Sequence, residues 1–125
     1  MKPRFRLTSS IDFKRVRRFG KSYAHPLVVL VVQPNELAAS RFGVAAGRAL
    51  GGAVKRNQAK RRLRAALQPM LEQAASGWDV IIIARQPLLE ASFMDICTAL
   101  EFLFIKASLL KKIDDFPQPS SSTTG

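Results

Sequence analysis

The spacing of apolar and polar residues near the start of the chain predicts a short helix. In the segment SSIDFKRVRRFG (9–20), Phe13 and Val16 lie three positions apart and share one helical face. One of the two serines at its start can accept a free backbone N–H of the first turn, and Gly20 can end the helix in a left-handed conformation. We therefore expect a first helix over residues 9–20 with one apolar face.

Four segments predict strands. HPLVVLVVQP (25–34) and GWDVIIIAR (77–85) are dominated by β-branched residues, and their near-continuous apolar character indicates burial on both faces of a sheet. RFGVAAG (41–47) predicts a weaker strand, because alanine and glycine have low strand propensity. KSYA (21–24) allows a further short pairing.

Two longer helices are predicted further along the chain. A basic helix runs from about residue 53 to residue 68, and Pro69, which lacks a backbone donor, ends it or opens a further short turn. A last helix covers roughly residues 90–111. The apolar residues that we expect to form its core stripe are Met94, Cys97, Leu100, Phe104 and Ala107.

The element order α-β-β-(β)-α-β-α predicts an α/β fold (an α+β sandwich), with a central sheet of about four strands and helices packed on it. The strand 41–47, the basic helix and the strand 77–85 could form a βαβ unit. A chain of 125 residues suits one domain, which we assign to residues 1–113. Residues 114–125 are rich in Pro, Ser and Thr without periodicity, and predict a disordered C-terminal tail.

Charge is distributed unevenly along the chain, whose net charge is +11. The first 64 residues hold sixteen of the twenty cations and two of the nine acids. Such a one-sided field favours an anionic partner, either nucleic acid or a membrane surface, over a merely soluble basic protein. No apolar run is long enough to span a bilayer and the N-terminus lacks the apolar stretch of a secretory signal, so we expect a cytoplasmic protein.

The basic helix separates its apolar and charged residues. On idealised helical geometry, Ala59, Leu63, Ala66 and Met70 form a narrow buried arc. A charged face without acids forgoes the ion pairs that solvated helices usually make, which favours nucleic-acid binding over a solvated face. The apolar arc is too alanine-rich for a membrane-surface helix. The polar residues that form one continuous stripe, here called the basic ridge, are Arg56, Asn57, Lys60, Arg61 and Arg64, whereas Lys55 and Arg62 lie on the other flank.

The sequence contains no recognisable set of catalytic side chains. His25 is the only histidine, Cys97 is the only cysteine, and the acids are dispersed rather than paired. The first helix instead mixes aromatic residues with cations, a combination that binds single-stranded nucleic acid by stacking and phosphate contact. The chain therefore predicts a nucleic-acid-binding protein that is not itself a catalyst.

Several sequence blocks together resemble one known family. GVAAGRALGGAVKRNQAKRRLRAAL (43–67) resembles the signature of the bacterial ribonuclease P protein component, and blocks near the start, at 79–87 and at 103–112 are similar to its flanking blocks in the same order. The sequence departs from the family pattern at Gly52, Gln58 and Arg17, and at Leu30, where a tyrosine is common.

The resemblance implies a protein subunit that assists a catalytic RNA in removing the 5′ leader from precursor tRNA. The enzyme would be a tRNA-maturing endoribonuclease whose Mg²⁺ is bound mainly by its RNA subunit. The implied partners are the ribonuclease P RNA and the leader. The resemblance also implies a ribosomal-protein-S5-domain-2-like fold with a left-handed βαβ crossover, whereas such crossovers are right-handed in about 98% of cases.

The resemblance assigns candidate residues to two functions. Residues expected to contact the catalytic RNA are Arg48, Arg56, Asn57, Lys60, Arg61 and Arg64. Residues expected to line a leader-binding cleft between the first helix and the sheet are Phe13, Arg15, Val16, Arg17 and Leu30. The alternative is a ribosomal or other structural RNA-binding protein with no role in tRNA processing, and a nuclease acting alone is disfavoured by the dispersed acids.

Overall fold

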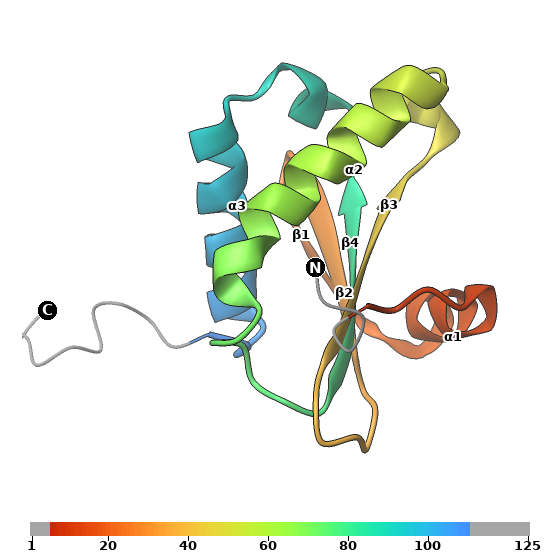
Figure 1. Ribbon diagram of the computed structural model, residues 1–125, viewed down its shortest axis with the longest axis vertical. Helices are drawn as coiled ribbons and strands as arrows, with labels where there is room; N and C mark the ends of the chain where they lie inside the picture. The colour runs from red at the N-terminus through yellow and green to blue at the C-terminus, as the bar shows by residue number, and fades with distance from the viewer. Residues whose placement is uncertain (1–5, 111–125) are drawn as a thin grey trace, which may run out of the picture.

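The computed structural model describes residues 6–110 and shows one sheet with helices on both faces (Figure 1). Helix α1 packs on one face, whereas α2 and α3 cover the other. This architecture confirms the predicted α/β fold with four strands. The elements are α1 (Ser10–Phe19), β1 (Lys21–Ala24), β2 (Val28–Pro34), β3 (Arg41–Ala46), α2 (Ala53–Leu67), β4 (Trp78–Ala84) and α3 (Phe93–Lys106), with short 3-10 turns η2 (Arg48–Leu50), η3 (Gln68–Met70) and η4 (Gln86–Glu90).

The strand order in the sheet is β1-β2-β4-β3. Strands β1 and β2 pair antiparallel, as do β2 and β4, whereas β3 and β4 are parallel neighbours. Helix α2 connects these two parallel strands, which confirms the predicted βαβ unit. The handedness of this connection stays a prediction, and so do the domain boundary at residue 113 and the C-terminal tail, which lie outside the described residues.

The sheet buries apolar side chains on both faces. Leu30, Ile82 and Phe42 point toward α2 and α3, where the Phe42 and Phe104 rings stack with centroids 6.1 Å apart. On the opposite face, Val16 of α1 packs on strand residues that alternate with the first set. Burial on both faces explains why β2 and β4 have near-continuous apolar sequences.

Helix α1 begins as predicted and ends differently. The Ser9 hydroxyl accepts the Asp12 backbone N–H at 3.4 Å, which caps the helix. Gly20 ends it in an extended conformation (φ −77°, ψ 164°), so the predicted left-handed conformation is wrong. A Cβ at this position would lie 2.5 Å from the Val16 carbonyl oxygen and 2.8 Å from Val31 Cγ1. Glycine is required here because helix and sheet approach each other closely.

Helix α3 is shorter than predicted, and its buried stripe differs. Ser92 caps its start by accepting the Asp95 backbone N–H at 3.0 Å, and Ser108 in a left-handed conformation (φ 63°) follows its end. Met94 is 75% exposed, so its assignment to the core is wrong. Leu100, Phe104 and Ala107 are buried as predicted, and Cys97 is partly buried. The stripe is completed by Ile96, Ala99 and Leu103.

Among residues 6–110, no helix combines the length and the apolar character needed to cross a bilayer.

Candidate nucleic-acid interface

Helix α2 presents the basic ridge to solvent because its apolar arc is anchored to the sheet and to α3. Ala59 and Leu63 are fully buried, and Ala66 and Met70 are at most 9% exposed, which confirms the predicted arc. Leu67 is buried beside them. The helix can therefore not rotate without losing core contacts, and the direction of the ridge is set by packing.

The basic ridge lacks a counter-charge within the described part of the chain. Asn57 and Arg61 are exposed, whereas Arg56, Lys60 and Arg64 are partly buried. The ion pairs found among residues 6–110 all involve Asp12 or Asp79, and none reaches α2. Arg48, in the turn η2 before the helix, is also exposed. This surface offers cations and one amide to an external anionic partner.

Arg62, on the opposite flank of α2, has a structural role. Its guanidinium donates to the Leu88 carbonyl oxygen at 3.2 Å and to the Ala91 carbonyl oxygen. Both carbonyls belong to the segment between β4 and α3. The arginine therefore ties that segment to α2, which agrees with its position off the basic ridge.

A cavity joins the basic ridge to α1. Its volume is about 180 Å³, and Arg64, Phe13 and Arg6 are among the side chains that line it. Gly43 of β3 forms part of its wall, and a Cβ there would lie 2.4 Å from Phe13 Cζ. The absence of a side chain at Gly43 thus lets the Phe13 ring lie against β3. The ridge and the aromatic residue of α1 form one continuous surface.

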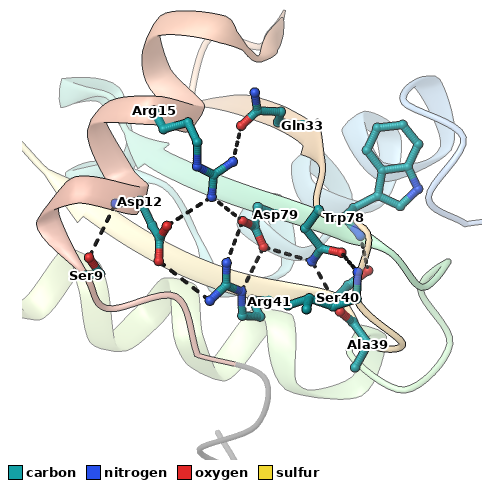
Figure 2. A network of polar contacts seen from close by, with 11 residues as sticks. Ser9, Asp12, Arg15, Gln33, Ala39, Ser40, Arg41, Trp78 and Asp79 are labelled. Carbon is teal, nitrogen blue, oxygen red and sulfur yellow. Dashed lines mark hydrogen bonds and ion pairs between the residues drawn. The ribbon is translucent and has the colours of Figure 1, made fainter.

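Beside this cavity, a charged network fixes α1 to the sheet (Figure 2). The Asp79 carboxylate of β4 is fully buried, and it accepts hydrogen bonds from Arg15 Nη2 at 2.6 Å and from Arg41 Nε at 2.9 Å. Asn35 Nδ2 donates to the same carboxylate at 2.9 Å. The Asp12 carboxylate pairs with both arginines, and Arg15 also donates to the Gln33 side chain. Two acids and two arginines make the network neutral overall.

These contacts determine how the groups titrate. Burial alone raises the pKa of the Asp79 carboxyl, but the hydrogen bonds from Arg41, Asn35 and Arg15 outweigh burial and hold that pKa below its usual range. The hydrogen bonds to Asp79 likewise raise the pKa of the Arg15 and Arg41 guanidinium groups. Asp79, Arg15 and Arg41 are therefore charged at neutral pH.

Two of the predicted cleft residues lie elsewhere. Leu30 is fully buried on the face covered by α2 and α3, so the prediction that it lines a cleft beside α1 is wrong. Successive strand residues face opposite sides of a sheet, and an assignment displaced by one residue selects the wrong face. Val16 is fully buried between α1 and the sheet, so it cannot line an open cleft.

The remaining cleft residues face the α1 side or solvent. Phe13 is partly buried in the cavity wall, and Arg17 is exposed. Arg15 is partly exposed, but its guanidinium is already engaged by the buried network. Their contact with a leader stays a prediction.

A row of small apolar residues crosses the sheet on the α1 side and was missed at the level of sequence. Ala24, Val29, Ile83 and Ala45 are paired across β1, β2, β4 and β3 in that order, and none of them is fully buried. We call this row the apolar strip. Strand alternation would have identified it once α1 was known to cover the odd-numbered residues of β2.

The fold and this surface together define a class: a small α/β protein with a basic helix face that makes no ion pair within residues 6–110 and that adjoins an aromatic and apolar surface. Such a combination suits single-stranded nucleic acid, with phosphates on the cations and bases on the apolar surface.

Comparison with known proteins identifies the family. The Ribonuclease P family model matches residues 1–108. The ribonuclease P protein component of Herpetosiphon aurantiacus is 40% identical over 115 residues, covering 92% of this chain and 91% of the relative. That of Symbiobacterium thermophilum is 40% identical over 113 residues, covering 90% and 98%. The solved RNase P protein of Staphylococcus aureus superposes with a TM-score of 0.77 at 30% identity, covering 86% of this chain and 98% of that one.

The chain therefore belongs to the family of ribonuclease P protein components, the protein subunits of a tRNA-processing ribonuclease. This membership confirms the predicted family and the predicted role as a ribonuclease P subunit, with the RNA of that ribonucleoprotein as its partner. It argues against the alternative of a structural RNA-binding protein outside tRNA processing.

Proposed function

We propose that this protein assists a catalytic RNA in removing the 5′ leader from precursor tRNA, acting in the cytoplasm. The observation that carries the proposal is the continuity between the basic ridge and the surface beside α1, which meet at the cavity lined by Arg64 and Phe13. One continuous surface can thus bind both the catalytic RNA and the leader of the precursor tRNA.

The basic ridge is the part suited to the catalytic RNA. Its side chains lie on a helix that the core holds rigidly, so their spacing is preset before binding. Arginine can bind phosphate through two parallel N–H groups, and Asn57 adds a donor and an acceptor that can distinguish RNA groups other than phosphate. We assign Arg48, Arg56, Asn57, Lys60, Arg61 and Arg64 to this contact.

The α1 side of the sheet is the part suited to the leader. Phe13 offers a partly exposed ring, Arg17 an exposed cation, and the apolar strip a surface on which unpaired bases can lie. Binding there would hold the substrate by its leader, while the chemistry takes place on the RNA subunit.

Within residues 6–110, no three Asp, Glu, His or Cys side chains gather where they could hold a metal ion. Mg²⁺ requires several free oxygen ligands, but the carboxylates of Asp79 and Asp12 are occupied by Arg15 and Arg41. We therefore assign the ion mainly to the RNA subunit. The protein would strengthen Mg²⁺ affinity indirectly, because its cations lower the repulsion between RNA phosphates.

Reconstitution with a bacterial ribonuclease P RNA tests the proposal. At low Mg²⁺, the protein should stimulate cleavage of precursor tRNA at its mature 5′ end. The variant Lys60→Ala combined with Arg64→Ala should lose most of this stimulation, whereas Lys55→Ala, which lies off the ridge, should retain it. Cleavage that is equally fast with and without protein at every Mg²⁺ concentration would refute the proposal.

A further inference from the structure

A second group of aromatic and basic side chains lies at the opposite edge of the sheet from the basic ridge. Lys21 and Tyr23 of the edge strand β1 contribute to it, and Lys21 Nζ lies 5.4 Å from the Tyr23 ring centroid. On α3, Lys106 Nζ lies 5.7 Å from the Phe102 ring centroid. The His25 ring connects the two elements, with its centroid 6.1 Å from that of Phe102. We call these five residues the β1–α3 patch.

The β1–α3 patch lies at the margin of the core, because Tyr23 packs against the core whereas Lys21, Phe102 and Lys106 are exposed. Phe102 is 51% exposed, although α3 has a complete buried stripe without it. Phe102 and Lys106 are four residues apart and so lie one above the other on the same face of α3. Lys21, Tyr23 and His25 alternate along the chain and therefore point to one side of the sheet. Two elements thus direct rings and cations toward a shared surface.

The chemistry of the β1–α3 patch suits an unpaired RNA segment. Aromatic rings accept stacked bases of any sequence, and neighbouring ammonium groups meet the phosphates. Within residues 6–110, neither Lys21 nor Lys106 forms an ion pair with a carboxylate. Arg85, which donates to the His25 carbonyl oxygen at 3.2 Å, adds a further exposed cation at this edge.

The position of the β1–α3 patch indicates which RNA would reach it. The apolar strip begins at Ala45 on β3, the strand that lines the cavity together with Arg64 of the basic ridge, and ends at Ala24 on β1. Four strands span only about 14 Å, which a few nucleotides cross. Ala24 lies between Tyr23 and His25 in sequence but faces the other side of the sheet. A strand that leaves the strip at Ala24 therefore meets the patch after turning around the edge of β1.

We propose that the β1–α3 patch binds the upstream nucleotides of the precursor tRNA leader, beyond those held on the apolar strip. The inference rests on the proposed function, because it requires a leader on the α1 side of the sheet. Short leaders end before the edge of β1, and only longer leaders gain the additional stacking and phosphate contacts.

Leader length provides the test. Equilibrium binding to the reconstituted ribonucleoprotein is measured for precursor tRNAs with leaders of about four and about twelve nucleotides. The Phe102→Ala and Lys106→Ala variants should each weaken binding of the long-leader precursor about five- to tenfold and leave the short-leader precursor unchanged. Phe102→Tyr, which keeps the ring, should restore long-leader affinity. Met94→Ala is the matched control, since Met94 is an exposed apolar residue of the same helix.

The outcomes separate this inference from the proposed function. If the unsubstituted protein stimulates cleavage of both precursors but Phe102→Ala and Lys106→Ala leave long-leader affinity unchanged, the β1–α3 patch does not bind the leader and the inference is wrong. Equal weakening for both leader lengths would also overturn it, because the patch would then contact the catalytic RNA or the tRNA body. Absence of stimulation for both precursors would instead refute the proposed function.

Discussion

Arg15 of α1 and Asp79 of β4 form a 2.6 Å ion pair between residues 64 positions apart in sequence. The carboxylate is fully buried, and it also accepts hydrogen bonds from Arg41 of β3 and from Asn35. Arg15, which the sequence predicted to contact the leader, is thus one of the side chains that hold α1 on the sheet. The position of α1 sets the width of the surface on which we place the leader, so stability and function meet at this pair.

Replacing Asp79 with asparagine should lower the free energy of unfolding at pH 7 by about 2–3 kcal/mol. Removing one member of a fully buried ion pair costs about 3–5 kcal/mol, and the loss here is smaller because the two arginine side chains are about a third exposed. Urea denaturation measures the change. Glu101→Gln, which neutralises an exposed acid of α3, should have little effect and serves as the control.

Asp79 should also make the free energy of unfolding depend on pH. The folded-state pKa of Asp79 lies below its unfolded-state value of about 3.9, so its contribution is complete above about pH 4 and is lost as the pH falls further. Urea denaturation between pH 3 and pH 7 should show the difference between the protein and Asp79→Asn shrinking toward acid. A difference that stays constant over this range would contradict the assignment.

Arg61 and Arg62 are neighbours on α2, but we expect the first to contribute to RNA binding and the second to stability. Arg61→Ala should weaken binding to ribonuclease P RNA and reduce the slope of log affinity against log salt by about 0.7–0.9, with the unfolding free energy unchanged within about 0.5 kcal/mol. Arg62→Ala should leave the slope unchanged and cost about 1–2 kcal/mol, because the Leu88 and Ala91 carbonyl oxygens lose a charged donor. Binding titrations at several salt concentrations and denaturation curves distinguish the two. A reduced slope for Arg62→Ala would place that side chain at the RNA.

Substitutions at Leu30 and Val29, which are adjacent on β2, should affect different properties: stability in the first case and leader binding in the second. Leu30→Ala should lower the unfolding free energy by about 2–5 kcal/mol, because the side chain is fully buried in the larger core. Val29→Ala should cost about 1 kcal/mol or less, yet weaken binding of the leader, since Val29 belongs to the apolar strip. Denaturation and precursor binding measure both effects. If leader affinity responded to Leu30 and not to Val29 among folded variants, the strip would be the wrong surface.

Gly43 should tolerate no side chain. Gly43→Ala places a methyl group 2.4 Å from Phe13 Cζ and 2.8 Å from the Leu7 carbonyl oxygen, so α1 and the segment before it must move, at a cost of about 1–3 kcal/mol. Gly47→Ala is the matched control, because its Cβ would meet nothing within 4 Å. Thermal denaturation compares the two. Combining Gly43→Ala with Phe13→Ala should cost less than the sum of the single changes, since one of the two clashes is removed.

Elements with a local signature were predictable from the sequence. The alternation of Ala59, Leu63 and Ala66 with the cations of α2 depends only on residues three or four positions apart, and the structure confirms the buried arc that it predicts. The Ser9 cap and the strands β2 and β4 also follow from short stretches of sequence. Met94 was misassigned because α3 is apolar on more than one side, so periodicity alone does not select its buried face.

The sequence by itself determined that the chain is a small α/β protein with one uncompensated basic helix face. Only the tertiary structure decided which side of β2 faces α1. It shows that Val29, and not Leu30, lies on the side of the candidate leader surface. It also decided that Arg15 and Arg41 bind Asp79 and that Arg62 binds backbone carbonyls, whereas the basic ridge makes no such ion pair within residues 6–110. The physical reason is that helical periodicity is a property of sequence neighbours. The partner of a charge and the face of a strand, by contrast, depend on packing between segments far apart in the chain.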